Sequence, residues 1–317
     1  MGPRMAADRE ALSRLTAAGP VDLSREDVRR FSEIDGHGRI TLLKGFSGCA
    51  IMLVERVDDD AFVRKISHDP AYNERLIKQV EKQIGFRATS ACQAIGVRGW
   101  GMLRSGLTYV DMAYVPGVTA AEALFGVKLA DIPQWAALLL EIAIPTEIGP
   151  VTMVPPSVFI DKIRSVEQQL RHKQVMTPVI DEALRRLLDY SWQEIPISAC
   201  HGDLTLENVI VHDDQLYLFD FLDSFADSWF IDVAKLMQDL IAGWSYRHEV
   251  IDRNLAIRLA ALRHCLAARL EERYPGALAS IHALYVLALI RILPYTTDLV
   301  ERGFIDQRVA AALNVIF

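Results

Sequence analysis

The chain has 317 residues, of which 51% are apolar and 24% are charged, and its formal net charge is −7. This composition is typical of a folded globular protein and argues against a disordered chain. The acidic balance argues against nucleic acid as a partner, because nucleic-acid-binding proteins usually carry a basic surface. A neutral or cationic small substrate fits this overall charge better.

The N-terminus, the apolar runs and the cysteines together predict a cytoplasmic protein. Residues 1–20 contain charged side chains and no apolar run, so we expect no secretory signal. The most apolar runs, 135–145 and 283–294, are shorter than the ~20 residues that span a bilayer, so we expect no membrane segment. The cysteines are widely spaced and predict neither a disulfide framework nor a zinc site. The pattern does not indicate an oligomeric state.

After a polar N-terminal extension, residues 1–37, the pattern predicts a small antiparallel sheet with one main helix. The expected strands are 40–44, 49–57, 61–67, 100–104 and 107–114. Apolar side chains at helical spacing predict the helix over 73–86. Residues 115–117, Val-Pro-Gly, break the pattern and form the expected hinge, so residues 38–115 are predicted to be a first lobe.

Residues 116–317 are predicted to form a larger, mostly helical lobe, which makes the fold class α+β. The expected helices are 120–125, 134–143, 157–171, 180–192, 232–243, 253–273 and 278–293. A β-hairpin interrupts them, with strands at 209–211 and 216–219 around a turn centred on Asp214.

The most informative feature is the segment His201-Gly-Asp-Leu-Thr-Leu-Glu-Asn208, followed twelve residues later by Asp220. Asp203 can orient and deprotonate an acceptor hydroxyl, while Asn208 and Asp220 can hold Mg²⁺ against nucleotide phosphates, so the spacing indicates phosphoryl transfer. A hairpin centred on Asp214 would set Asn208 opposite Asp220, roughly 5 Å apart at Cβ. The alternative, in which Asp203 caps a turn and Asp220 ends a strand, leaves the spacing unexplained.

A lysine on an apolar strand face is the second candidate feature. Strand alternation places Lys65 on the same face as Ala61 and Val63. There it can reach nucleotide phosphates, held by a carboxylate of the following helix, for which Glu81 is the first candidate and Glu74 the second. The alternative is an edge-strand lysine that extends to water beside a solvated glutamate.

A glycine turn precedes this lysine in the sequence. Gly45, Ser47 and Gly48 lie between the first two strands, where backbone N–H groups and a hydroxyl could cover the phosphates. An ordinary hairpin turn would use the same residues, so the position before Lys65 carries the interpretation.

A glycine turn, a strand lysine, a helix glutamate, a hinge and His-Gly-Asp-x-x-x-x-Asn with a later Asp-Phe together resemble the aminoglycoside phosphotransferase and choline kinase family, small-molecule relatives of protein kinases. The resemblance covers residues 38–317 in organisation, with its specific residues in 201–235. It implies a bilobal protein-kinase-like fold, ATP or GTP as the nucleotide, and Mg²⁺. By position, Asp203 would be the catalytic base, and Lys65 would hold the α- and β-phosphates with its position fixed by Glu81.

The same resemblance implies roles for further residues. Met112 and Tyr114 would line the adenine pocket, and His201 would be a structural hydrogen-bonding residue beneath the loop. Asp232 matches an aspartate of the family, but its place at the head of an apolar run favours a helix N-cap. Leu222 stands where protein kinases have glycine, so an activation switch of the protein-kinase kind is not expected.

These residues predict an ATP-dependent phosphotransferase that acts on a hydroxyl of a small polar metabolite, with a sugar, amino sugar or amino alcohol as the favoured acceptor. One alternative is a catalytically inactive kinase-like protein that binds nucleotide and acts through interaction, although the intact residue set counts against it. Another is a metal phosphohydrolase built on His201 and Asp203, which would need more clustered ligands. We expect the acceptor near residues 155–173, Arg291 and Tyr295, although helix packing is the favoured explanation for the last two.

Overall fold

The chain forms two compact units in a computed structural model, which describes residues 32–34, 38–43, 48–56, 60–145 and 152–316. The first unit comprises the described residues up to Ala88 with Gln93–Gly117 and Tyr217–Asp223, and the second comprises Thr89–Cys92, Val118–Leu216 and the residues from Ser224 onward. Strands and helices are mixed, which confirms the predicted α+β class. None of the helices in these described ranges has both the length and the apolar character needed to cross a membrane.

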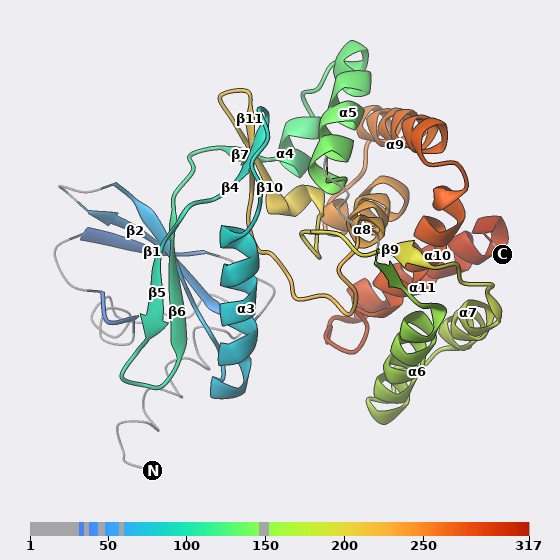
Figure 1. The fold of residues 1–317 in the computed structure, drawn as a ribbon, viewed down its shortest axis with the longest axis horizontal. Coiled ribbons are helices and arrows are strands. Elements are labelled where there is room, and N and C mark those ends of the chain that lie inside the picture. Colours follow the sequence, from blue (N-terminus) through green and yellow to red (C-terminus); the bar gives the residue numbers. More distant parts are fainter. Residues whose placement is uncertain (1–31, 35–37, 44–47, 57–59, 146–151, 317) are drawn as a thin grey trace. The chain divides into compact units, whose positions relative to one another are not determined.

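The first unit is built on a five-stranded antiparallel sheet with the order β1-β2-β3-β6-β5 (Figure 1). Its strands are β1 Gly38–Leu43, β2 Ala50–Arg56, β3 Phe62–Ile66, β5 Val97–Met102 and β6 Thr108–Ala113. The main core includes Met52, Phe62 and Ile66, and Ile34 from the segment before β1 packs into it. The helix α3, Asn73–Ile84, packs against β5 and β6 through a separate, smaller apolar cluster.

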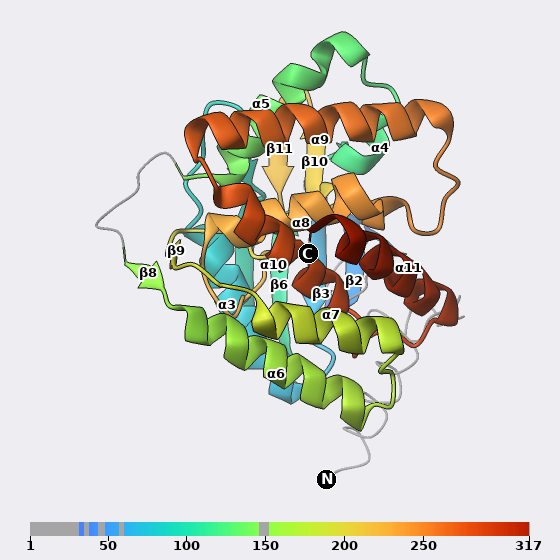
Figure 2. The same cartoon turned by 90° about the vertical axis from the view of Figure 1, so that its right-hand side faces the viewer.

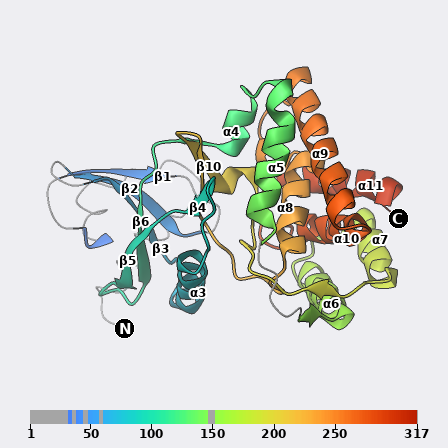
Figure 3. The ribbon, with the colours of Figure 1, turned by 45° about the horizontal axis from the view of Figure 1, so that its top comes forward.

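Helices dominate the second unit, and α10 lies among the others (Figure 2). They are α4 Ala120–Leu124, α5 Ile132–Ala143, α6 Pro156–His172, α7 Pro178–Asp189, α8 Trp229–Ala242, α9 Arg253–Arg273, α10 Ala277–Ile290 and α11 Leu299–Ile316. Nearly every side chain of α10 is buried, because α7, α8, α9 and α11 all pack against it. The helix α5 lies along α9 (Figure 3). The second unit thus has a mostly apolar, mostly buried central helix.

The sequence pattern does not predict α11. Its buried side chains Ile305 and Val309 follow helical spacing, but Leu299 and Val300 in the first turn are exposed. Gly303 also lowers the helix propensity of this segment. Together these features obscure the apolar stripe by which a helix is identified.

Short strands form the remaining sheets. They are β4 Cys92–Ala94, β7 Val118–Thr119, β8 Met153–Val154, β9 Ile195–Pro196, β10 Val209–His212 and β11 Gln215–Leu218. One sheet has the order β4-β11-β10-β7, and β8 pairs with β9. The sequence predicts β10 and β11 but not the other four, because two or three residues are too few to show an alternating pattern.

The turn of the β10–β11 hairpin is tighter than predicted. Asp213 and Asp214 both have positive φ, 47° and 60°, as in a two-residue type I′ turn. The centre of the hairpin therefore lies between these two residues rather than on Asp214. The predicted register needed the ladder to extend to Asn208 and Asp220, whereas β10 begins at Val209, β11 ends at Leu218, and Asn208 belongs to the preceding 3₁₀ turn.

Candidate active site

The first unit brings Lys65 of β3 against Asp220, which lies 155 residues later in the chain. The side chains form an ion pair in which 7% of the Lys65 side chain is exposed. Lys65 lies opposite Val110 of β6, and Val110 packs with Leu76 and Val80 of α3. Burial disfavours the charged form of the lysine, but the carboxylate of Asp220 outweighs it, and the pKa of Lys65 is raised. A charged ammonium group is therefore held on the sheet face that α3 covers.

The expected counter-ion of Lys65, Glu81, does not occupy that position. The side chain of Glu81 is exposed, and the pairing carboxylate is that of Asp220. The prediction took Leu76, Ile77, Val80 and Ile84 as the apolar side of this helix, with Glu81 at its inner edge. The buried stripe keeps Leu76 and Val80 but adds Gln79 and Gln83, and Ile84 is 60% exposed. Glu81 follows Val80 by one residue, about 100° around the helix, and so it points away from the sheet. The reserve candidate, Glu74, pairs with Lys78 on the outer surface.

The segment that carries Asp220 is fastened to the end of α3. Lys82 donates a hydrogen bond to the carbonyl oxygen of Leu222 at 3.0 Å. The buried ring of Phe221 packs edge-on against Phe86, with 5.6 Å between the ring centroids. Asp220 has a φ of 60°, which is uncommon for a residue other than glycine. These two anchors hold a strained backbone in the conformation that aims the carboxylate at the buried ammonium.

The other nucleotide-binding candidates lie at different places in the first unit. Gly48 has a φ of +73°, a conformation that glycine adopts without strain. Gly45 and Ser47 lie outside the described residues. Met112 packs against the apolar cluster under α3, and Tyr114 is 42% exposed. Their roles toward a nucleotide stay predictions.

The second unit holds Asp203 and Asn208 on one tight loop. The side-chain amide of Asn208, at the end of a 3₁₀ turn, donates a hydrogen bond to the carbonyl oxygen of Asp203 at 2.8 Å. The backbone N–H of Asp203 donates to Nδ1 of the buried His201 at 3.2 Å. Gly202 has a φ of 88°, which permits the sharp bend between them. This hydrogen bond joins the buried His201 to the backbone of Asp203.

A buried carboxylate on α8 holds the start of this loop. Asp232 is 1% exposed and accepts hydrogen bonds from the backbone N–H of His201 at 2.6 Å and of Gly202 at 2.7 Å. The expectation that Asp232 caps the helix is wrong, because α8 begins at Trp229 and its N-cap is Ser228. Asp232 instead fixes the backbone of the loop that carries Asp203.

A second aspartate of the same helix holds the middle of the loop. Asp239 accepts hydrogen bonds from the backbone N–H of Leu206 at 2.6 Å and from the N–H and hydroxyl of Ser245 at 3.0 and 2.8 Å. Burial raises the pKa of Asp239 to about 7, although these donors oppose the shift. Asp239 was not among the residues predicted from the sequence. The signal that could have found it is its spacing of seven residues from Asp232, which puts both on one helix face.

Lys235, also on α8 and also missed, pairs directly with the predicted catalytic base. Its Nζ lies 2.9 Å from Oδ1 of Asp203 and 3.2 Å from Oε1 of Gln238. Burial disfavours the carboxylate of Asp203, but the positive charge of Lys235, with smaller contributions from His201 and Arg291, outweighs it, so the pKa of Asp203 is lowered. Asp203 is therefore ionised at neutral pH.

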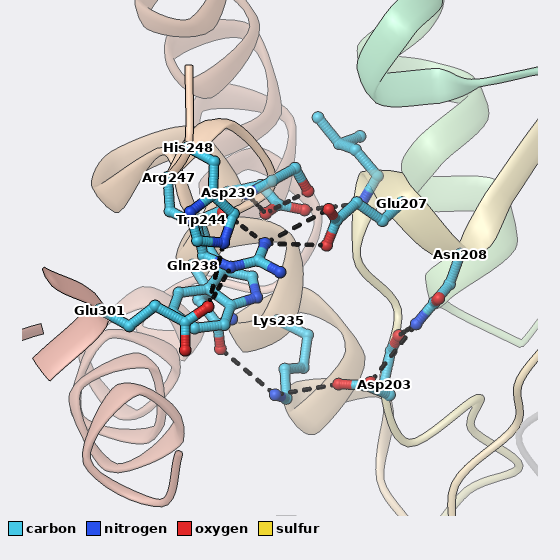
Figure 4. Close-up of polar contacts among 12 residues, drawn as sticks. Asp203, Glu207, Asn208, Lys235, Gln238, Asp239, Trp244, Arg247, His248 and Glu301 are labelled. Atoms are coloured by element: carbon cyan, nitrogen blue, oxygen red, sulfur yellow. Dashed lines mark hydrogen bonds and ion pairs between the residues drawn. The ribbon is translucent and has the colours of Figure 1, made fainter. Parts of the chain in front are cut away.

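An arginine ties the loop to the C-terminal helix (Figure 4). The side chain of Arg247 is 3% exposed and lies 3.2 Å from a carboxylate oxygen of Glu207 and 3.2 Å from one of Glu301 on α11. Its guanidinium also covers the ring of Trp244, 4.3 Å from the centroid. Burial raises the pKa of Glu207, while the attraction of Arg247 acts against this shift. The carboxylate that directly precedes Asn208 is thus neutralised from within the protein.

A sequence profile of the phosphotransferase enzyme family matches residues 55–279, which include Lys65, Asp203, Asn208 and Asp220. The chain belongs to this family. The match confirms the predicted resemblance and makes the protein a phosphotransferase by membership. Among curated proteins, none matches this sequence.

Solved structures show the fold of this phosphotransferase. A thermostable mutant of aminoglycoside phosphotransferase APH(4)-Ia, in a ternary complex with AMP-PNP and hygromycin B, superposes with a TM-score of 0.57 and 16% identity, covering 90% of this chain and 97% of that one. Amicoumacin kinase hAmiN, in complex with AMP-PNP, Ca²⁺ and Ami, gives a TM-score of 0.53 and 13% identity over 92% and 94% of the two chains. These similarities confirm the predicted protein-kinase-like architecture.

Proposed function

We propose that this phosphotransferase moves the γ-phosphoryl group of ATP, or of GTP, to a hydroxyl group of a small polar molecule. The ion pair between Lys65 and Asp220 carries the proposal. A buried ammonium group is costly to desolvate, and its pairing with the part-exposed carboxylate of Asp220 adds little net stability, so its presence on an apolar sheet face is best explained by a ligand that uses it. The AMP-PNP in the two solved structures of the same fold supports a nucleotide as the donor.

Asp220 and Asn208 are the residues that would hold Mg²⁺. A carboxylate and an amide oxygen are the hard ligands that this ion prefers. The amide nitrogen of Asn208 is committed to the carbonyl oxygen of Asp203, which leaves the oxygen side of the amide for a ligand. The side chain of Asp220 is 36% exposed despite its pairing with Lys65. The bound ion would offset the charge of the nucleotide phosphates.

Asp203 is the proposed catalytic base. Its carboxylate would accept the proton of the acceptor hydroxyl while the hydroxyl oxygen bonds to the γ-phosphorus and the bond from that phosphorus to the bridging oxygen breaks, which yields ADP and a phosphate ester. Lys235 keeps Asp203 ionised and orients it. A carboxylate with a lowered pKa is a weak base, so we attribute most of the rate to positioning by the loop that Asp232 and Asp239 hold.

The test is ATP-dependent phosphorylation across sugars, amino sugars, amino alcohols and aminoglycosides, with Asp203→Asn beside wild type. The matched control is Asp213→Asn, because Asp213 is an exposed turn residue whose positive φ asparagine tolerates. We expect turnover in wild type and the control, and a loss of at least about 100-fold in Asp203→Asn. Nucleotide binding without turnover on any acceptor would favour the catalytically inactive alternative, and absent nucleotide binding would contradict the assignment of Lys65 and Asp220.

A further inference from the structure

Lys235 is the residue at which a buried stretch of α8 reaches solvent. Every residue of this helix from Trp229 to Leu240 is buried except Lys235, and 12% of the Lys235 side chain is exposed. Its partner Asp203 has 29% of its side chain exposed. A lysine on a helix that is otherwise buried usually extends its ammonium group into water. Here the ammonium group instead stays beside Asp203, at a place that is only partly closed to solvent.

Two contacts hold this ammonium group (Figure 4). Nζ of Lys235 lies 2.9 Å from Oδ1 of Asp203 and donates a hydrogen bond to Oε1 of Gln238 at 3.2 Å. Gln238 is 1% exposed, so it is a fixed acceptor on the same helix. An ammonium group has three N–H donors. The contacts between described residues therefore leave one donor of Lys235 for a ligand.

A role limited to orienting Asp203 does not explain why the partner is positively charged. Burial disfavours the carboxylate of Asp203, but the charge of Lys235 outweighs it and lowers the pKa, which makes Asp203 a weaker base. A neutral donor would orient the carboxylate without this effect. The segment 201–208 contains no lysine or arginine, so α8 supplies the cation that pairs with its aspartate. A second anion that comes to the same place explains the charge better.

We propose that Lys235 is a catalytic residue that donates its third N–H to an oxygen of the transferring phosphoryl group. The proposal rests on the proposed function. An acceptor hydroxyl that gives its proton to Asp203 has its oxygen about 2.6–3.2 Å from the carboxylate, and the phosphorus that it attacks lies about 3–3.5 Å from that oxygen. A cation 2.9 Å from the same carboxylate can then reach the phosphoryl oxygens, over which negative charge is spread in the transition state. Lys235 stays protonated throughout.

The binding of a phosphoryl mimic tests this role. Aluminium fluoride beside bound ADP and Mg²⁺ resembles the phosphoryl group in transit, and transition-state analogues bind more tightly than substrates. Calorimetry measures the affinity for ADP·Mg²⁺ with and without aluminium fluoride, which gives the increase in affinity for each protein. The variants are Lys235→Gln, which keeps an N–H donor but loses the charge, and Lys235→Arg, which keeps the charge. The control is Lys128→Gln, which removes an exposed lysine from the same unit.

The same substitution in an Asp203→Asn background separates an action on the phosphoryl group from an action through Asp203. Asparagine leaves no carboxylate for Lys235 to orient or to keep ionised. If Lys235 acts only through Asp203, replacing it changes nothing in this background. The double variant Asp203→Asn/Lys235→Gln also lacks both charges of the pair, so it avoids the instability of a part-buried carboxylate without its partner.

We expect aluminium fluoride to raise the ADP affinity of wild type, Lys235→Arg and the control about tenfold or more, and Lys235→Gln to lose this increase in both backgrounds. The affinity for ADP·Mg²⁺ alone should stay within about threefold in all of them. No increase in wild type, or an increase that Lys235→Gln retains in either background, would overturn the proposal while leaving the nucleotide site intact. ADP·Mg²⁺ that does not bind wild type at all would contradict the proposed function, and this proposal with it.

Discussion

Replacing Asp232 by asparagine should destabilise the second unit by about 2–5 kcal/mol, because two hydrogen bonds to a charged group contribute about 1.5–3 kcal/mol each and the one neutral bond that asparagine keeps contributes only about 1 kcal/mol. The carboxylate of Asp232 accepts the backbone N–H groups of His201 and Gly202 at 2.6 and 2.7 Å. Asparagine keeps the shape of the side chain but accepts only one of them and turns its own NH₂ group toward the other. Water cannot replace the lost acceptor, because the side chain is 1% exposed.

Urea unfolding, followed by tryptophan fluorescence and circular dichroism, measures this effect. The control is Ser228→Ala, which removes the N-cap of the same helix and should cost about 1 kcal/mol. We also expect Asp232→Asn, but not Ser228→Ala, to lower kcat, since the loop that carries Asp203 loses its anchor. If Asp232→Asn costs no more than Ser228→Ala and leaves kcat unchanged, the carboxylate does not hold the loop and the reasoning is refuted.

Three further outcomes are expected. Lys65→Met, which keeps the side-chain volume and leaves Asp220 without its partner, should weaken ATP binding by calorimetry at least about tenfold, and unchanged affinity would remove the lysine from the nucleotide site. The lowered pKa of Asp203 places the acid limb of the kcat/KM profile below the usual carboxyl range, so activity is lost only as pH falls through that low value. Lys235→Met should move this limb to higher pH, and a limb that stays in place would contradict the pairing. Burial raises the pKa of Cys92 to about 12, so mass spectrometry should find its thiol unmodified by iodoacetamide at pH 8 unless the protein is first unfolded.

The loop that carries Asp203 and Asn208 could be singled out from the sequence because its residues are close together in the chain. Asp203 and Asn208 lie within one short segment, and their spacing alone indicates their chemistry. The groups that hold the loop come from α8, and their contacts depend on how that helix packs. An aspartate at the head of an apolar run therefore resembles a helix cap until the start of the helix is known, which is why the role of Asp232 was misassigned.

The partner of Lys65 could not be predicted for a similar reason, because it depends on which face of α3 packs against the sheet. Two apolar stripes can be drawn on α3, one through Ile77 and Ile84 and one through Leu76 and Val80, and the sequence does not choose between them. Packing against the sheet decides which stripe is buried. The same packing buries Gln79 and Gln83, which a pattern of apolar residues would assign to the surface. A rotation of about 100° in this choice decides whether Glu81 faces the lysine or the solvent.

The first unit is discontinuous in sequence, so no single stretch of the gene encodes all of it. Its last contribution, residues 217–223, follows roughly a hundred residues of the second unit. A fragment that stops at Gly117 would bury the ammonium of Lys65 without the carboxylate of Asp220 and would leave Phe86 without the ring of Phe221. Recombination therefore cannot exchange this unit as one continuous segment. A chimera with a relative must take the residues up to Gly117 and residues 217–223 from the same parent.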